Sequence, residues 1–176
     1  FEEYFLNQFI SIDTDNFCLA LSGGLDSIVL LHLLHNHFKD KFSIRVIHVN
    51  HNLNANSDEW SKFCKEECLK YGFEFFSKSI NPKNMGFGLE ANARKKRYQV
   101  FKKFLNPGEC LLTAHHKTDQ LETILFRMFR GTGIDGLKGI IQKDHLGQNP
   151  IFRPLLNCSQ SELNEYAKVQ KLAWVN

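Results

Sequence analysis

One stretch near the N-terminus constrains the fold more than any other part of the chain: residues 17–34, FCLALSGGLDSIVLLHLL. Residues 17–21 form an apolar run of the length of a buried strand, and residues 28–34 are apolar almost throughout, which suits a helix pressed against a sheet. Two adjacent glycines separate the runs and permit backbone angles that side chains forbid. This order predicts an α/β domain, with a mostly parallel central sheet and helices on both faces.

The turn between this strand and helix is a candidate phosphate site. Free backbone N–H groups at a helix N-terminus, the helix dipole and the hydroxyls of Ser22 and Ser27 together attract an anion. No lysine follows the glycines, so the turn is not a Walker A loop. Asp26 stands where the anion would lie, and a hard cation, usually Mg²⁺, would have to separate the two. The alternative is an ordinary strand-to-helix turn in which Ser22 only caps the helix.

A second polar cluster, TAHHKTDQLET at residues 113–123, follows a predicted strand at 110–113 and opens a helix. Asp119 and Glu122 are three residues apart, so both carboxylates are expected to point the same way. Opposite Asp26, they could hold Mg²⁺ or an ammonium group, and His115 and His116 could polarise a phosphate or carry a proton. The simpler alternative is that acidic residues stabilise the first turn of a helix without any ligand.

Two further regions supply candidates. A β-branched strand at residues 44–49 runs into polar residues 50–54, and ligands of open parallel sheets bind at the carboxyl ends of strands. His48 and His51 are therefore candidates to line an adenosine pocket, although a backbone hydrogen bond is an equally good explanation for His48. On a predicted helix at 89–104, Arg94 and Arg97 lie beside an apolar stripe, and arginine pairs with phosphate as a two-pronged donor. The crevice is thus predicted at the carboxyl ends of the strands at 17–21, 44–49 and 110–113.

Length and composition set wider limits. The 176 residues suffice for one compact domain, and a net charge of +3 allows a nucleic-acid partner without requiring one. No apolar run approaches the ~20 residues of a membrane helix, and nothing at the N-terminus resembles a signal peptide. The five scattered cysteines favour free thiols in a reducing cytoplasm. Residues 131–150 are expected to be mostly loop, residues 159–162 a capping box that opens a last helix, and residues 172–175 the start of another strand.

Several strings point to a family when they are taken together. SGGLDS, HVNHNL, EANAR, AHHKTDQLET, RGTG and FRPLL occur in the same order as in the tRNA(Ile)-lysidine synthetase family. Over nearly its whole length the chain resembles the N-terminal catalytic domain of that family. The resemblance implies an adenine nucleotide alpha hydrolase-like fold, with residues 1–176 as the PP-loop ATP pyrophosphatase domain and without the family's C-terminal tRNA-binding domains. Binding of tRNA by these residues alone is therefore expected to be weak.

The resemblance also implies a reaction. The family uses ATP to adenylate the C2 carbonyl oxygen of the wobble cytidine in an isoleucine tRNA with a CAU anticodon, and pyrophosphate leaves. The amino group of free L-lysine then displaces AMP, and the product is lysidine. ATP and Mg²⁺ are the implied cofactors, and the implied location is cytoplasmic, with no membrane association. The oligomeric state is left open, with a homodimer as one option.

Roles for individual residues follow from the same resemblance. It implies catalytic roles for Asp26, Arg94, His115, Asp119 and Glu122. It implies nucleotide binding by Ser22, Gly23, Gly24, Leu25, Asp26, Ser27 and His51. Mg²⁺ would bind Asp26 and Asp119, whereas Asp119 and Glu122 together would bind the ammonium of lysine or a second metal. Arg127, Arg130 and Arg153 are further candidates for contact with substrate or tRNA. Thr118 departs from the family pattern, which usually has an aspartate there.

Two other functions compete with this one. Another PP-loop ATP pyrophosphatase, of the tRNA 2-thiocytidine type, would carry paired Cys-x-x-Cys ligands for a cluster, and this sequence has none. A non-catalytic nucleotide-binding module would have no need of Asp26, Asp119 and Glu122 together. Release of AMP and pyrophosphate that depends on both lysine and the tRNA separates the three functions.

Overall fold

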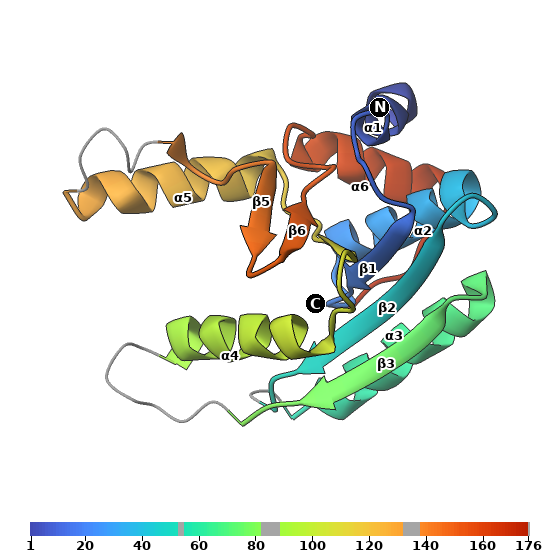
Figure 1. Cartoon of the computed structure of the whole chain (residues 1–176), viewed down its shortest axis with the longest axis horizontal. Coiled ribbons are helices and arrows are strands. Elements are labelled where there is room, and N and C mark those ends of the chain that lie inside the picture. Colours follow the sequence, from blue (N-terminus) through green and yellow to red (C-terminus); the bar gives the residue numbers. More distant parts are fainter. Residues whose placement is uncertain (53–54, 82–88, 132–137, 176) are drawn as a thin grey trace.

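The computed structural model describes residues 1–52, 55–81, 89–131 and 138–175. In these residues six strands form one sheet in the order β3-β2-β1-β4-β6-β5, and every neighbouring pair is parallel except β5 with β6 (Figure 1). The strands are β1 (Asn16–Ala20), β2 (Ser43–Asn50), β3 (Glu74–Ser79), β4 (Cys110–Leu112), β5 (Lys143–Leu146) and β6 (Asn149–Phe152). The helices are α1 (Glu2–Phe9), α2 (Leu25–Phe38), α3 (Ser57–Tyr71), α4 (Leu89–Phe104), α5 (Lys117–Phe129) and α6 (Gln160–Val169). The predicted α/β class with a mostly parallel sheet is confirmed.

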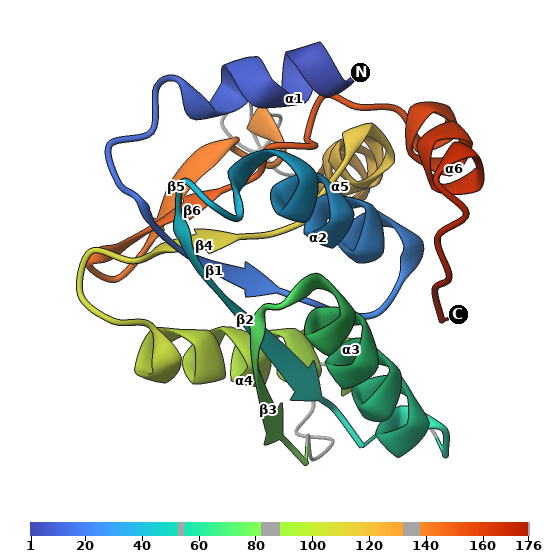
Figure 2. The same cartoon turned by 90° about the vertical axis from the view of Figure 1, so that its right-hand side faces the viewer.

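The sheet has a core on each face because successive side chains of a strand point in opposite directions. From the β1 segment, Phe17, Leu19 and Leu21 join the larger core, which α1, α2, α3 and α6 cover. Cys18 points to the other face and packs with Phe101 and the rest of the apolar side of α4. Figure 2 shows α4 on one side of the strands and α1, α2, α3 and α6 on the other. Helices on both faces were predicted, and this too is confirmed.

The strand order fixes where a ligand can bind. From β1 the chain builds the sheet outward through β2 to β3, whereas β4 and the strands after it lie on the other side of β1. The segments that leave the carboxyl ends of β1 and β4 therefore diverge to opposite sides and leave a crevice between them. The two polar clusters of the sequence, at residues 22–27 and 113–123, both follow these strand ends.

The β5–β6 hairpin was not predicted, since residues 131–150 were expected to be mostly loop. Residues 132–137 lie outside the described residues, but residues 143–152 form two short antiparallel strands. Gly147 takes a φ of 67° in the connecting turn, a left-handed angle that glycine adopts readily. The side chain of Asn149 ties β6 to the segment before β4, because its Nδ2 donates to the carbonyls of Asn106 at 2.6 Å and Glu109 at 2.9 Å.

The prediction of a strand at residues 172–175 was wrong. This segment forms no ladder. Its backbone bonds run from the N–H of Leu172 to the carbonyl of Ala167 at 2.9 Å and from the N–H of Val175 to the carbonyl of Gly23 at 3.0 Å. Leu172 is buried and Trp174 packs against the larger core, so burial in irregular backbone explains the apolar character that suggested a strand. The predicted capping box at the start of α6 is confirmed, with Ser159 and Glu162 bonded reciprocally.

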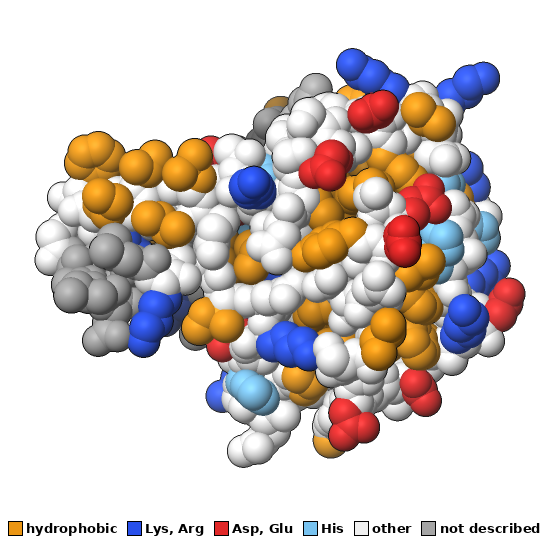
Figure 3. Space-filling view, turned by 90° about the horizontal axis from the view of Figure 1, so that it is seen from above, with side chains coloured by type: hydrophobic (Ala, Val, Ile, Leu, Met, Phe, Trp, Pro, Cys, Tyr) orange, Lys and Arg blue, Asp and Glu red, His pale blue; other side chains and the backbone are white. Residues whose placement is uncertain are grey.

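The outer part of α5 stands away from the rest of the molecule (Figure 1). None of its residues is buried, and Phe129 is 88 % exposed. Exposed apolar side chains gather along it, as the space-filling view shows (Figure 3): Leu121, Leu125, Phe126, Met128 and Phe129. None of the described helices has both the length and the apolar character that crossing a membrane requires.

Candidate functional site

The turn after β1 depends on a glycine at position 23. Gly23 has a φ of 92°, which side chains rarely allow, and its neighbours leave no room for one. A Cβ atom there would lie 2.9 Å from Cys64 Sγ and 2.9 Å from Val175 Cγ2. The turn is therefore clamped between α3 and the segment that follows α6, and this fixes the direction in which α2 starts.

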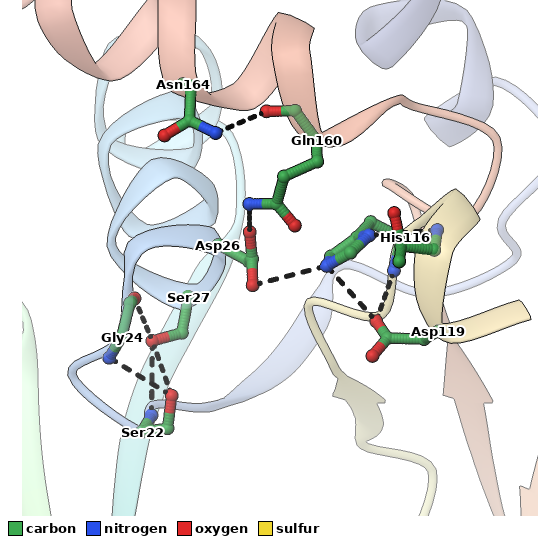
Figure 4. A network of polar contacts seen from close by, with 9 residues as sticks. Ser22, Gly24, Asp26, Ser27, His116, Asp119, Gln160 and Asn164 are labelled. Carbon is green, nitrogen blue, oxygen red and sulfur yellow. Dashed lines mark hydrogen bonds and ion pairs between the residues drawn. The ribbon is translucent and has the colours of Figure 1, made fainter. Parts of the chain in front are cut away.

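Two serine hydroxyls organise the backbone of this turn (Figure 4). Ser27 Oγ accepts hydrogen bonds from the N–H groups of Ser22 and Gly23, at 3.3 and 3.1 Å, and donates to the carbonyl of Gly24 at 2.9 Å. Ser22 Oγ accepts from the N–H of Gly24 at 3.3 Å. The turn thus gathers N–H and O–H donors at the positive end of α2, an arrangement that suits phosphate oxygens. An anion that binds there would compete with the serine oxygens for these donors.

Asp26 and Asp119 lie on either side of one imidazole (Figure 4). His116 Nε2 is 3.5 Å from Asp26 Oδ2 and 3.6 Å from Asp119 Oδ2. His116 Nδ1 accepts the N–H of Thr118 at 3.1 Å, so in the neutral ring the proton lies on Nε2, between the carboxylates. His116 is also the N-cap of α5, and its own N–H donates to Asp119 Oδ2 at 2.8 Å.

A third element holds Asp26. Gln160, the first residue of α6, donates from Nε2 to Asp26 Oδ1 at 3.1 Å. Burial raises the pKa of the Asp26 carboxyl above its ordinary value and the charge of Asp119 adds to this, although His116 and Gln160 oppose the rise. A site that crowds two carboxylates in this way is stabilised by a cation.

A cavity of about 690 Å³ adjoins this group, which is a usual size for a small-molecule site. It lies at the predicted edge of the sheet and is lined from the ends of β1, β2 and β4 and from α4. Its lining includes Ser22, Asp26, Ser27, His48, Asn50, His51, Arg94, Arg97, Tyr98, His115 and Asp119. The turn after β1 is thus open to a ligand on one side, with Asp119 facing the same space.

Two histidines from the end of β2 line the cavity in neutral form. His48 Nδ1 donates to the carbonyl of Leu21 at 2.9 Å, and burial lowers its pKa. The pKa of His51 is also lowered, chiefly by burial and to a smaller extent by repulsion from Arg97 and from His48. His51 Nδ1 is buried and has no hydrogen-bond partner in the part of the chain that the structure describes. Because buried polar atoms are nearly always paired, this nitrogen marks a place where a ligand atom would fit.

His115 and Arg94 meet the cavity from β4 and α4. His115 Nδ1 lies 2.9 Å from Thr113 Oγ1, and burial, followed by repulsion from Arg153, lowers the pKa of His115 to about 4. The ring is therefore neutral near pH 7. The Arg94 guanidinium lies over the ring of Tyr98, 5.4 Å from its centroid, and remains exposed enough to pair with an anion.

A model of the PP-loop domain family matches residues 1–176, the whole chain. The chain belongs to the PP-loop family. ATP use follows from this membership, and we refer to the turn of residues 22–27 as the PP-loop. We call the cavity that this turn and the acidic pair border the ATP cavity, a name that anticipates the proposed function.

Among curated proteins, the chain is similar in sequence to tRNA(Ile)-lysidine synthases. The chain is 42% identical over 174 residues to a tRNA(Ile)-lysidine synthase of Histophilus somni, and the match covers 97% of this chain and 40% of that protein. It is 39% identical over 175 residues to the enzyme of Actinobacillus pleuropneumoniae, covering 99% of this chain and 39% of the relative. The PP-loop chain thus spans about two fifths of the length of the curated relatives it matches.

Solved structures support the fold. The U34-tRNA thiolase NcsA from Methanococcus maripaludis, solved with its [4Fe-4S] cluster, superimposes with a TM-score of 0.76 at 16% identity, over 99% of this chain and 64% of that one. The NH3-dependent NAD synthetase from Campylobacter jejuni gives a TM-score of 0.61 at 16% identity, over 97% of this chain and 70% of that one. At such identities the likeness concerns the fold of the PP-loop domain alone.

Two carboxylates beside the PP-loop are the side chains that could hold a metal ion. Among the described residues no group of three or more His, Cys, Asp or Glu side chains is arranged to hold a metal. Mg²⁺ is commonly held by one or two carboxylates together with substrate phosphates, and Asp26 and Asp119 would supply two such carboxylates. All five cysteines are buried and unpaired.

Not every residue singled out in the sequence lines the cavity. Glu122, expected to point with Asp119 toward Asp26, is exposed on α5 and is not part of the lining. Gly23, Gly24 and Leu25 belong to the PP-loop but are not part of the cavity lining. Sequence reasoning missed Gln160 entirely and left His116 without a definite role. Nothing in the sequence ties Gln160 to Asp26, whereas the capping position of His116 could have been inferred from its place just before a helix.

Proposed function

We propose that this domain joins lysine to C2 of the wobble cytidine of an isoleucine tRNA with a CAU anticodon, using ATP and forming lysidine. The observation that carries the proposal is the meeting of Asp26 and Asp119 across His116, beside the PP-loop. The relatives that match nearly all of this chain are tRNA(Ile)-lysidine synthases, which supports the choice of substrate. A tRNA substrate and ATP are both met in the cytoplasm, which is the proposed location.

In the first step the C2 carbonyl oxygen of the cytidine attacks the α-phosphorus of ATP and pyrophosphate leaves. The N–H and O–H donors of residues 22–27 would hold the departing β- and γ-phosphates. Asp26 and Asp119 would hold Mg²⁺, which neutralises charge that builds up on the leaving group. Arg94 would pair with the α-phosphate, and positioned charges of this kind supply most of the rate in such chemistry.

In the second step the ammonium of lysine loses a proton to solvent and the resulting amine attacks C2. The C2–O bond breaks and AMP leaves with that oxygen. His115 would donate a hydrogen bond to an oxygen of the departing AMP, since the ring is neutral and its Nδ1 already contacts Thr113. Glu122, exposed on α5 three residues after Asp119, would attract the ammonium of the entering lysine. His51, whose buried Nδ1 is without a partner among the described residues, would bind the adenosine.

The cysteines argue against a sulfur-transfer reaction. Burial raises the pKa of every one of the five thiols, so none is poised as a reactive thiolate. The likeness to the thiolase of Methanococcus maripaludis concerns the fold, and the two chains share 16% identity. Ligation of an amine therefore fits this site better than transfer of sulfur.

The test is an assay of AMP and pyrophosphate release with the isoleucine tRNA transcript, ATP, Mg²⁺ and labelled lysine. We expect release that needs both tRNA and lysine, label bound to the tRNA, and at least a ~100-fold loss in an Asp26→Asn variant. A Lys65→Glu variant, altered at an exposed position of α3 away from the cavity, is the matched control. Release that is independent of lysine, or an active Asp26→Asn variant, would contradict the proposal.

A further inference from the structure

A second cavity, of about 600 Å³, lies between α4 and the β5–β6 hairpin. We call it the α4–hairpin groove, and the residues that matter for its chemistry are Arg94, Lys95, Tyr98, Lys102, Asp144 and Arg153. Four of these side chains are basic and one is acidic, so the groove attracts anions. Arg94 and Tyr98 also line the ATP cavity, which makes the groove its direct neighbour.

Arg153 gives the groove a buried cation with spare hydrogen-bonding capacity. The residue is 4 % exposed. Its guanidinium donates to the carbonyl of Ile141, and its Nη2 lies 3.6 Å from Asp144 Oδ2. Its Nε, in contrast, has no partner among the described residues. A buried N–H without an acceptor is costly, so an additional acceptor at this wall of the groove would stabilise the protein.

The α4 side of the groove has the features of a surface that binds single-stranded nucleic acid. Lys95 and Lys102 are exposed and stand seven residues apart, which puts both on the groove side of the helix. The guanidinium of Arg94, the residue before Lys95, lies over the Tyr98 ring, and both residues line the two cavities. Basic side chains that follow a backbone, together with aromatic or guanidinium planes on which bases stack, are the usual means of holding an RNA strand.

We propose that the α4–hairpin groove binds the phosphodiester backbone of the RNA next to the nucleotide that reacts in the ATP cavity. The identity of the RNA rests on the proposed function. A nucleotide within a polymer must enter the cavity with its neighbours attached, and these need an adjoining surface of positive charge. The groove is such a surface, since it shares Arg94 and Tyr98 with the cavity. Lys95 and Lys102 contact phosphates.

The test compares two doubly substituted proteins of equal charge. Lys95→Glu with Lys102→Glu alters the groove, whereas Lys65→Glu with Lys103→Glu alters exposed lysines that line neither cavity. Lys103 is the immediate neighbour of Lys102 on α4, which makes the control a close one. Because the stem of Lys102 lies against the hairpin turn at Gly147, a Lys95→Gln, Lys102→Gln protein with milder changes is measured as well. Thermal melts establish that all variants are folded.

Affinity for a fluorescent anticodon stem–loop RNA is measured by anisotropy at low salt, and ATP affinity by calorimetry. We expect the groove variant to lose about 10-fold or more in RNA affinity, with a shallower salt dependence, because two phosphate contacts are lost. The control should lose no more than about 2-fold by general charge alone. ATP affinity should be unchanged in both. Equal losses in the two variants, or no loss in the groove variant, would overturn the proposal.

Lysine transfer is measured separately, so that the two proposals can fail independently. If the wild type transfers no lysine but only the groove variant loses RNA affinity, the proposed function fails and the groove remains an RNA site. If lysine transfer is intact and the groove variant binds RNA as the wild type does, the groove proposal fails. A raised KM for lysine with unchanged RNA affinity would instead make the groove a site for the amino acid, which also overturns the proposal.

Discussion

His116 does two jobs at once, through its two ring nitrogens. Nδ1 caps α5 by accepting the N–H of Thr118, and this fixes the proton on Nε2, where it lies between Asp26 and Asp119. Two carboxylates this close repel each other unless a donor or a cation lies between them. The imidazole therefore stabilises the two carboxylates that lie on either side of it.

A His116→Asn variant separates the two jobs. The Asn Oδ1 can still cap the helix, so we expect the free energy of unfolding to change by less than about 1 kcal/mol. The N–H between the two carboxylates, in contrast, is lost. Lysine-dependent AMP release should fall by roughly 10-fold or more, because the carboxylates are no longer held in place. His116→Ala should lose the same activity and about 1 kcal/mol more stability. Urea unfolding and the AMP assay check both; an Asn variant as active as the wild type would refute the positioning role.

His115 gives the folded protein a pH dependence with a definite sign. Its pKa is lowered from 6.5 to about 4, chiefly by burial, so in the unfolded chain it takes up a proton near pH 6.5 and in the folded protein only near pH 4. The stabilisation is complete above pH 6.5 and is lost as the pH falls toward 4. We expect the Tm of the wild type to decrease as the pH falls from 6.5 to 4, and the Tm of a His115→Gln variant to decrease less. Melts at a series of pH values check this, and identical slopes would contradict it.

At the scale of elements, the PP-loop excludes a side chain at Gly23 on two independent grounds. Gly23 has a positive φ, and the atoms of Cys64 and Val175 occupy the space that a Cβ would need. We expect Gly23→Ala to cost about 2–4 kcal/mol, from backbone strain and overpacking together.

Gly108 provides the matched control for this substitution. Its φ is 79°, but nothing lies within 4 Å of the position a Cβ would take. Gly108→Ala should therefore cost only the strain, about 1 kcal/mol. Urea unfolding of the two variants measures the difference. Equal losses would mean that the clamp by α3 and the final segment contributes nothing.

The elements that carry the site were also the ones that the sequence made predictable. Residues 17–34 combine an apolar strand, two glycines and an apolar helix, and residues 113–123 combine a strand end with helix-opening polar residues, so local chemistry agrees with the fold in both. The β5–β6 hairpin has no such signal. Its strands are four residues long, one contains Pro150, and it depends on distant partners such as Asn106.

The error at residues 172–175 has a related cause. An apolar run shows that a segment is buried, but it does not distinguish a strand from buried irregular backbone.

The contact of Gln160 was missed for another reason. It meets Asp26 only because α6 packs against α2, 134 residues away along the chain, and no local pattern encodes that contact. Glu122 was expected in the site because of its spacing from Asp119. That spacing predicts a shared helix face, but it does not tell whether the cavity extends as far as Glu122.

On the scale of the whole molecule, stability and chemistry lie at opposite edges of the sheet. The PP-loop, His115 and Asp119 follow the carboxyl ends of the strands. Near the amino ends, Arg45 binds Glu109 through two bonds, Nε to Oε1 at 2.8 Å and Nη2 to Oε2 at 2.6 Å. Glu109 is 4 % exposed and also accepts the N–H of Asn106 at 2.9 Å. The Arg45 guanidinium in turn lies over the Phe104 ring, 4.6 Å from its centroid.

This separation predicts that the two edges can be impaired independently. Removing one partner of a buried ion pair leaves the other charge without compensation, so Glu109→Ala should cost about 3 kcal/mol of stability. Below its lowered Tm, however, the activity per folded molecule should equal that of the wild type, because Arg45 and Glu109 do not line the ATP cavity. An Asp119→Asn variant should show the converse, with little change in Tm and a large loss of activity. The activity per folded molecule is the rate of AMP release divided by the number of sites that an ATP titration counts, and thermal melts give the Tm. If folded Glu109→Ala protein lost as much activity as Asp119→Asn does, the prediction would be wrong. The strands would then transmit structural changes at the amino edge to the site.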